Sequence, residues 1–364
     1  RGTRVNLKYV GQIERANAVL FAIPTPLPGY LILHVMLNHM RRICGVQVDH
    51  PRARCQEVWN VEVDSSLTYA YAGHNMAFNA PTAVAIAPHH VFAAGGTRRM
   101  IIDISSGTVL KEVQAVAPPT GPLAVHGNLV LVPEGQFLAL YELETLQLID
   151  RLAVPGSRWL FAPSAGALFP IQDEEHEHTA IWQYDRNVVW ELGVHESLIS
   201  QPILTPTQAI IPIGGGSPTH IAALDAETGA TQWQVGFPRP EPLYPMSDGP
   251  SHVRHCGAIR NGNLVTVTAL PAVAALNTDS GAVLWNIALE DATAAFATTN
   301  RCAWVSTDSC QLLAVDDRRG TILDSGSVSP DNGRPKHLFP VSLDSGADEV
   351  LMITGGGRVY HAEI

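Results

Sequence analysis

The sequence has few charged and few aromatic residues, and it has no long uninterrupted apolar run. Charged residues make up 16% of the 364 positions and aromatic residues 7%, whereas 46% are hydrophobic. This amount of apolar side chain fills a large core and excludes a disordered chain. Because no stretch of about 18 apolar residues runs without a charge or a turn signal, we predict that the chain has no membrane span.

Positive charge is scarce as well. The 23 lysines and arginines are outnumbered by 34 aspartates and glutamates, so the formal net charge is −11 and nucleic acid is not an expected partner. The five cysteines form no C-x-x-C pair, which indicates neither a zinc finger nor a dense disulfide framework. We interpret them as reduced, mostly buried thiols. The alternative, in an oxidising compartment, is a Cys44–Cys55 or a Cys302–Cys310 disulfide.

An initiator methionine and a signal-peptide pattern are also missing, since the chain begins Arg1-Gly2-Thr3. We therefore expect either that a leader has been removed or that the chain is a module of a longer bacterial protein.

Glycine and proline, in contrast, are abundant, at 30 and 26 residues, which favours many short strands and tight turns. Four segments share one ending, in which a tryptophan is followed by a polar and then an aliphatic residue. The four tryptophans are Trp59, Trp190, Trp233 and Trp285. A pattern that recurs in this way indicates an architecture built from repeats.

The clearest copies of the repeat are residues 221–233 and 272–285. In each, an aliphatic strand ends in Asp or Asn, whose side chain can accept hydrogen bonds from backbone amides of a turn. A glycine, Gly229 or Gly281, then takes the left-handed position of that turn. We predict that these segments are the last two strands of a repeated four-stranded antiparallel unit.

The pattern aliphatic-Leu-Asp-x-x-Thr-Gly-x-x-x-Trp at 221–233 resembles the repeat of the pyrroloquinoline-quinone-like, or quinoprotein-like, β-propeller family. The resemblance implies an all-β propeller in which the repeated tryptophans dock neighbouring blades, so we expect their role to be structural. The family's dehydrogenases carry adjacent cysteines over their cofactor. No two cysteines are adjacent here, so we expect a non-enzymatic member without a cofactor.

The repeat can be followed along nearly the whole chain. Seven complete blades are predicted at about 17–63, 79–115, 121–154, 158–194, 202–237, 254–289 and 295–328. Residues 337–364 supply three further strands, and Arg4–Val10 matches the last-strand pattern. We therefore predict an eight-bladed propeller over 1–364 as a single domain. Residues 1–14 provide the closing strand, and 337–364 form the remainder of a composite last blade.

Three blades lack the repeated tryptophan. Lys111, Asp150 and Asp324 stand at its position, and we expect looser joints between blades there.

Function is expected in the loops, because the strands are needed for packing. In a four-stranded meander, the connectors between blades lie on one face. That face receives three unusual loops, at 64–79, 173–178 and 238–255. Their aromatic, charged and methionine side chains are types enriched at interfaces. The predicted partner-binding residues are Tyr71, His74, Tyr244, Met246, Asp248, His252, Arg254 and His255.

One candidate metal site is present. His176-x-His178 places two imidazoles close together within an acidic run, a set that Zn²⁺ or Mn²⁺ accepts, although an acidic solvated loop is the plainer interpretation. We predict a non-catalytic interaction platform, or a sensor or scaffold module, whose partners are another protein or other domains of the same longer chain. The alternative is a propeller enzyme that binds a small ligand or metal in its central funnel, using His176, His178 and His255.

Overall fold

The structure is a computed structural model of the chain. It describes residues 5–13, 18–25, 27, 29–37, 40–49, 54–64, 83–86, 89–119, 123–126, 128–134, 137–153, 167–172, 177–183, 186–191, 197–198, 203–204, 207–214, 220–236, 253–260, 264–269, 272–291, 293–341 and 348–364. These residues form strands β1 to β32 and one short 3-10 helix, η1 (Pro330–Asn332). Across these ranges, no helix is long and apolar enough to cross a membrane.

Within the described residues, the strands form eight antiparallel sheets, which we number in chain order. Sheet 1 contains β2 (Ala18–Pro24), β3 (Tyr30–Leu37), β4 (Met40–Asp49) and β5 (Arg54–Asp64). Sheet 2 contains β6 (Ala83–Ile86), β7 (His90–Gly95), β8 (Arg98–Asp103) and β9 (Val109–Gln114). Sheet 3 contains β10 (Ala124–His126), β11 (Leu129–Glu134), β12 (Phe137–Glu142) and β13 (Leu148–Ala153). Sheet 4 contains β14 (Ala167–Gln172), β15 (Glu177–Gln183) and β16 (Arg186–Glu191).

The remaining sheets complete the series. Sheet 5 contains β17 (Ser197–Leu198), β18 (Ile203–Leu204), β19 (Gln208–Gly214), β20 (His220–Asp225) and β21 (Thr231–Gly236). Sheet 6 contains β22 (Val253–Arg260), β23 (Leu264–Ala269), β24 (Ala272–Asn277) and β25 (Val283–Ala288). Sheet 7 contains β26 (Thr293–Thr298), β27 (Cys302–Thr307), β28 (Gln311–Asp316) and β29 (Ile322–Ser327). Sheet 8 contains β30 (Pro335–Pro340), β31 (Glu349–Thr354), β32 (Arg358–Glu363) and the N-terminal β1 (Asn6–Gln12).

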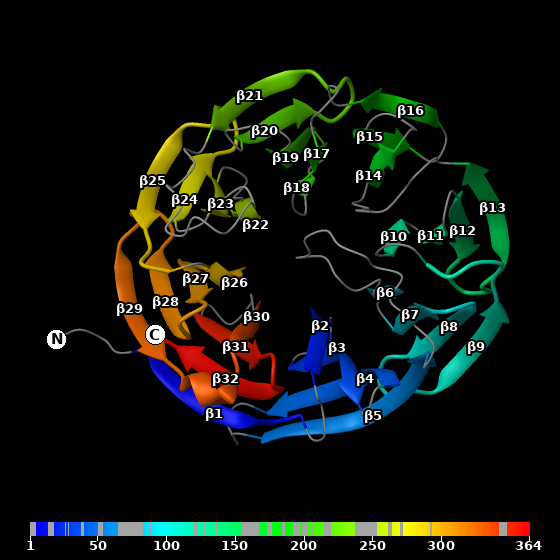
Figure 1. Cartoon of the computed structure of the whole chain (residues 1–364), viewed down its shortest axis with the longest axis horizontal. Coiled ribbons are helices and arrows are strands. Elements are labelled where there is room, and N and C mark those ends of the chain that lie inside the picture. The colour runs from blue at the N-terminus through cyan, green and yellow to red at the C-terminus, as the bar shows by residue number, and fades with distance from the viewer. Residues whose placement is uncertain are drawn as a thin grey trace, which may run out of the picture.

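The sheets stand around a ring, with the first strand of each near the centre and the last at the rim (Figure 1). The predicted all-β class and propeller architecture are therefore confirmed. In sheet 8 the outer position belongs to β1, which pairs with β32 from Asn6 opposite Glu363 to Gln12 opposite Arg358. The first and last parts of the chain thus lie side by side in one sheet.

Sheet 5 departs from the predicted four strands. Its inner position is divided between β17 and β18, two residues each, and both pair with β19. Pro202 and Pro206 flank β18 in the sequence. Because proline has no backbone N–H to donate to a ladder, long regular pairing is not available at this position.

The core is divided among the joints between neighbouring sheets. Trp59 and Ile32 of sheet 1 pack with Met100 of sheet 2, and Ala303 of sheet 7 packs with Trp285 of sheet 6. Apolar side chains of sheet 8 pack with sheet 7 on one side and with sheet 1 on the other. Sheets covered on both faces need aliphatic strands with little polar alternation, which is the pattern of this sequence.

The turn between the last two strands has similar hydrogen bonds in different sheets. In sheet 5, Oδ1 of Asp225 accepts the backbone N–H groups of Glu227 at 3.0 Å and Thr228 at 2.8 Å. Gly229 follows with a φ of 72°, in the left-handed region that favours glycine. In sheet 2, hydrogen bonds from Ser105 and Ser106 lower the pKa of Asp103 to about 2. The predicted turn chemistry is confirmed.

Candidate functional site

Three repeated tryptophans join one sheet to the next. The indole N–H groups of Trp59, Trp233 and Trp285 donate to backbone oxygens in the turns of sheets 2, 6 and 7. The acceptors are Ile104 at 3.0 Å, Thr278 at 2.6 Å and Asp317 at 2.7 Å. Each tryptophan is 8% exposed, so the predicted structural role of these three is confirmed.

The turn glycines leave room for these rings. A Cβ atom added to Gly281 would lie 2.5 Å from Cε3 of Trp233, and one added to Gly320 would lie 2.6 Å from Cγ of Trp285. Both glycines also have positive φ angles, 68° and 65°. The glycine of the repeat therefore has two roles: it adopts the positive φ that its turn requires, and its missing side chain leaves space for the tryptophan of the preceding sheet.

The residues that replace tryptophan occupy the same position in the strand pairing as the tryptophans do. Lys111, Asp150 and Asp324 lie opposite Ile101, Leu140 and Ala314, as Trp233 lies opposite Ala223. In sheet 8 the corresponding residue is Lys8, opposite His361. We expected looser joints at these places, but two of them contain buried charged groups that sequence reasoning did not identify.

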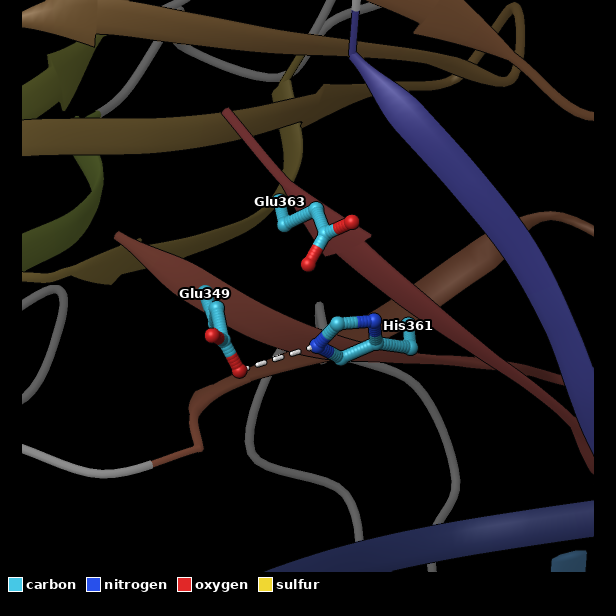
Figure 2. Close-up of side chains that lie close together, drawn as sticks. All are labelled: Glu349, His361 and Glu363. Carbon is cyan, nitrogen blue, oxygen red and sulfur yellow. Dashed lines mark hydrogen bonds and ion pairs between the residues drawn. The ribbon is translucent and has the colours of Figure 1, made fainter. Parts of the chain in front are cut away.

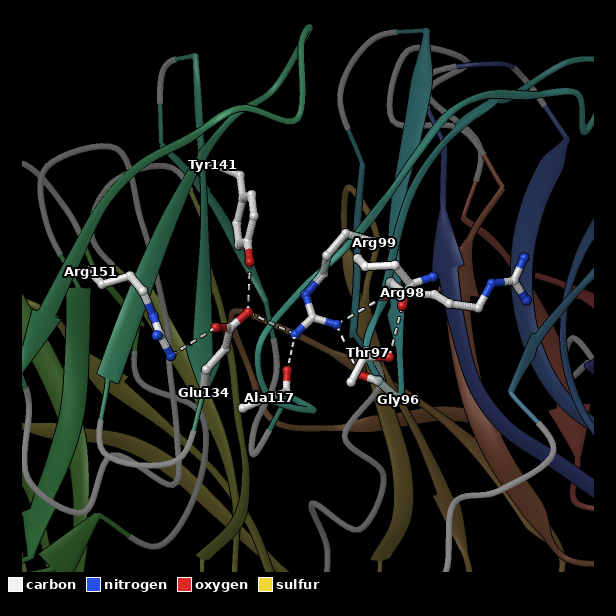
Figure 3. A network of polar contacts seen from close by, with 9 residues as sticks. Gly96, Thr97, Arg98, Arg99, Ala117, Glu134, Tyr141 and Arg151 are labelled. Carbon is white, nitrogen blue, oxygen red and sulfur yellow. Dashed lines mark hydrogen bonds and ion pairs between the residues drawn. The ribbon is translucent and has the colours of Figure 1, made fainter.

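The joint between sheets 2 and 3 contains a buried ion pair (Figure 3). The guanidinium of Arg99 in β8 lies 2.7 Å from Oε1 of Glu134 at the end of β11, and both side chains are nearly inaccessible to solvent. Arg99 also donates to the backbone oxygens of Gly96, Arg98 and Ala117. These bonds satisfy charges that would be very costly to bury alone.

Two further side chains complete this network. The hydroxyl of Tyr141 donates to Oε1 of Glu134 at 2.9 Å, and Arg151 lies 3.5 Å from Oε2. Burial, together with the charge of Glu134, raises the pKa of Tyr141 to about 12, so this phenol stays a donor at physiological pH. The network therefore links β8, β11, β12 and β13 across the joint.

The joint between sheets 7 and 8 also depends on a buried carboxylate. Asp348, just before β31, accepts Thr299 Oγ1 at 2.9 Å, the backbone N–H of Arg301 at 2.9 Å and Nε of Arg301 at 2.6 Å. Burial by itself would raise the pKa of Asp348. The hydrogen bonds and the charge of Arg301 outweigh it and leave that pKa below its usual value. A polar clamp thus stands where sheet 7 lacks tryptophan.

Four thiols are free in the structure, namely Cys44, Cys55, Cys302 and Cys310. Neither of the two bridges left open by the sequence is formed. Burial raises the pKa of Cys44 to about 12 and that of Cys55 to about 11. Both thiols therefore stay protonated at neutral pH, which does not favour a nucleophilic role.

Most predicted partner-binding residues lie outside the described residues. This applies to Tyr71, His74, Tyr244, Met246, Asp248 and His252. The same holds for His176 of the predicted metal pair, whereas His178 is placed in β15. Arg254 and His255 belong to β22, the inner strand of sheet 6. The partner-binding set and the metal pair stay predictions.

The topology nevertheless relates the predicted segments to one another. Residues 65–82 connect β5, the last strand of sheet 1, to β6, the first strand of sheet 2. Residues 237–252 connect β21 to β22 in the same way. In a ring of meanders, both connections join outer strands to inner strands on the same face.

Comparisons with known proteins agree with the repeat. The family model described as outer membrane protein assembly factor BamB matches residues 217–363, which contain both clearest repeat copies. No curated protein matches the chain at a significant level. The resemblance to the quinoprotein-like propeller repeat is therefore confirmed.

Solved structures share the fold at low sequence identity. BamB from Moraxella catarrhalis is 13% identical with a TM-score of 0.63, over 98% of this chain and 100% of that one. The C-terminal WD40 domain of Sif2 is 12% identical with a TM-score of 0.72, over 100% and 99%. A europium-containing methanol dehydrogenase is 11% identical with a TM-score of 0.60, over 97% and 85%. One fold thus serves different functions, so function has to come from the residues of this chain.

Proposed function

We propose that this chain, a β-propeller with repeats of the quinoprotein-like family, is a non-catalytic platform that binds a protein partner. The observation that carries the proposal is that the described polar groups join neighbouring sheets. The tryptophan joints, the network around Glu134 and the clamp around Asp348 all hold sheets together. These contacts join the sheets into a scaffold, and binding residues are commonly carried by the segments that connect the elements of such a scaffold.

The binding surface is the face that carries the connectors between sheets. Its predicted contact residues are Tyr71, His74, Tyr244, Met246, Asp248, His252, Arg254 and His255. Aromatic, methionine and arginine side chains are enriched at interface centres, because they supply large contact areas. The partner is another protein or a further domain of the same longer chain. Similarity to an assembly factor and to a WD40 domain supports this general role.

The platform is a single eight-bladed domain over 1–364. Two observations support closure of the ring by residues 1–14 and 337–364. The ladder between β1 and β32 joins the ends of the chain. The apolar cluster that contains Leu33 and Leu351 joins sheet 8 to sheet 1. A closed ring has no free edge at the junction, which protects it from edge-to-edge association.

The test is the variant Tyr244→Ala with Arg254→Ala. The intact chain is first used to isolate its partner, and the affinity of both chains for the purified partner is then measured by calorimetry. We expect the double variant to bind about 2 kcal/mol more weakly, roughly 30-fold in Kd, with a nearly unchanged melting temperature.

The matched control is Arg318→Ala with Arg319→Ala. Both residues are exposed in the short turn of sheet 7, on the opposite face. This control should bind the partner as the intact chain does. Loss of binding in the control but not in the test variant would contradict the assignment of the face. A native mass spectrum that shows a bound small molecule would instead favour a propeller enzyme.

A further inference from the structure

Three potential metal ligands converge at one end of sheet 8 (Figure 2). Nε2 of His361 lies 3.1 Å from Oε2 of Glu349, and the ligand atoms of Glu349, His361 and Glu363 all lie within 4.8 Å of one another. Within the described ranges, this is the one group of three His, Cys, Asp or Glu side chains so close together. The imidazole is only 5% exposed, while both carboxylates are partly exposed.

Glu363 does not cap a turn, whereas the residues at the same repeat position in five other sheets do. The corresponding residues end the third strand and cap the turn to the fourth. They are Asp103, Glu142, Asp225, Asn277 and Asp316. In sheet 8 no such turn exists, because β1 supplies the outer strand from the other end of the chain. The carboxylate of Glu363 instead accepts Nδ2 of Asn6 at 2.7 Å.

The other two residues occupy repeat positions that, in the five other sheets compared, never hold a carboxylate opposite the acid and an imidazole two places before it. The residues opposite the repeat acid are His90, Leu129, Gln208, Leu264 and Cys302, whereas sheet 8 has Glu349. The residues two places before the acid are Ile101, Leu140, Ala223, Ala275 and Ala314, whereas sheet 8 has His361. Sheet 8 therefore departs from the repeat at the two positions that surround Glu363.

Two carboxylates meet at this end of the sheet, where Lys8 of β1 lies opposite His361. Glu349 and Glu363 lie directly opposite each other in neighbouring strands. Like charges in directly opposed positions destabilise a sheet. A divalent cation between the two carboxylates would remove this repulsion, and the imidazole of His361 supplies a nitrogen ligand beside them.

We propose that Glu349, His361 and Glu363 bind a divalent transition-metal ion of the Zn²⁺ class. Mixed imidazole and carboxylate ligands suit Zn²⁺, whereas Mg²⁺ prefers oxygen ligands alone. Ligand atoms around a tetrahedral Zn²⁺ lie about 3.3 Å apart. The 3.1 Å between Nε2 of His361 and Oε2 of Glu349 already fits this spacing, and the carboxylate of Glu363 lies within 4.8 Å of both. Asn6 orients Glu363 from β1. Three protein ligands leave one position for water or for a residue of a partner.

The site is independent of the connector face. Glu349 begins β31 and Glu363 ends β32, so both lie at the end of the sheet where the short turns of the other sheets are found. Failure of one proposal therefore leaves the other intact.

The test uses the full chain, purified without a histidine tag and freed of metal by a chelator. Zn²⁺ is titrated against a competing chromophoric chelator, and melting is followed with and without Zn²⁺. We expect tight binding of Zn²⁺, a higher melting temperature and no comparable effect of Mg²⁺. Glu349→Gln and Glu363→Gln, which preserve side-chain size, should each weaken Zn²⁺ binding at least tenfold, and His361→Gln should abolish it.

Two controls separate this site from others. Glu142→Gln changes the corresponding acid of sheet 3, where no imidazole is adjacent, and should leave Zn²⁺ affinity unchanged. The variant His176→Ala with His178→Ala tests whether bound Zn²⁺ belongs instead to the predicted histidine pair. The proposal is overturned if both glutamine variants bind Zn²⁺ as the intact chain does, if the intact chain binds none, or if only the His176 and His178 variant loses binding. Should His361→Gln fail to fold, the two glutamine variants decide.

Discussion

One tryptophan side chain supplies both a hydrogen bond and buried apolar surface to the joint between two sheets. Trp285 donates to the oxygen of Asp317 in the next sheet and covers Gly320, while its backbone stays in its own ladder. The indole of Trp285 thus combines a directional hydrogen bond with a large buried apolar surface at a single position.

We predict that Trp285→Ala lowers the free energy of unfolding by about 3–5 kcal/mol, because it removes a large buried side chain and leaves a cavity. The measurement is urea denaturation followed by circular dichroism. The control is Lys111→Ala, which changes the same repeat position where the side chain is exposed, and it should lie within about 0.5 kcal/mol of the intact chain. Equal stability of the tryptophan variant and the intact chain would contradict a structural role.

At the scale of elements, five of the joints use polar contacts of two chemical kinds. Sheets 1, 5 and 6 each dock through a tryptophan on the following turn. Sheets 2 and 7, which lack it, are joined to the next sheet by ion pairs: Arg99–Glu134, in which both side chains are buried, and Arg301–Asp348, in which only the carboxylate is buried. An ion pair of this kind costs desolvation energy and depends on every partner being present.

We predict that Arg99→Met lowers the free energy of unfolding by about 3–5 kcal/mol, because Glu134 is left as a buried carboxylate without its main partner. The double variant Arg99→Met with Glu134→Leu should lose less than the sum of the two single changes. Chemical denaturation of the three variants gives the interaction energy.

A neighbouring pair provides the control for this joint. Arg98 and Glu112 form an exposed ion pair at 2.8 Å, one residue along from Arg99. Glu112→Gln should cost no more than about 1 kcal/mol, since exposed pairs contribute little. If Arg99→Met costs no more than this control, the buried pair is not what holds sheets 2 and 3 together.

At the scale of the whole molecule, a short N-terminal strand supplies the outer position of the sheet formed by the C-terminal strands. β1 covers the edge of β32, and Val5 and Val10 pack into the apolar clusters on either side of sheet 8. Its contribution therefore extends to both neighbouring joints.

We predict that deletion of residues 1–14 lowers stability by several kcal/mol and promotes aggregation, since it exposes a free sheet edge. Thermal melting and light scattering measure the two effects. Deletion of residues 1–3 alone leaves β1 intact and should behave as the intact chain does. A fourteen-residue deletion that melts like the intact chain would show that the ring does not depend on this strand.

The repeat made much of the fold predictable. The first blade was expected at about 17–63, and the four strands of sheet 1 run from Ala18 to Asp64. The joining of Arg4–Val10 to the C-terminal strands also followed from the pattern. Both inferences rest on local chemistry, because an aliphatic strand, an Asp or Asn cap and a glycine act over a few residues.

The sequence by itself therefore determined the strands, the turns and the tryptophan joints, since these recur with a period and each copy supports the interpretation of the others. Only the tertiary structure brought Arg99 to Glu134, Asp348 to Arg301, and Asn6 to the carboxylate of Glu363. The members of these pairs are separated by 35, 47 and 357 positions, so no single stretch of the repeat contains both members of a pair. Their meeting depends on how the sheets stack and where the ring closes, which short-range patterns do not encode.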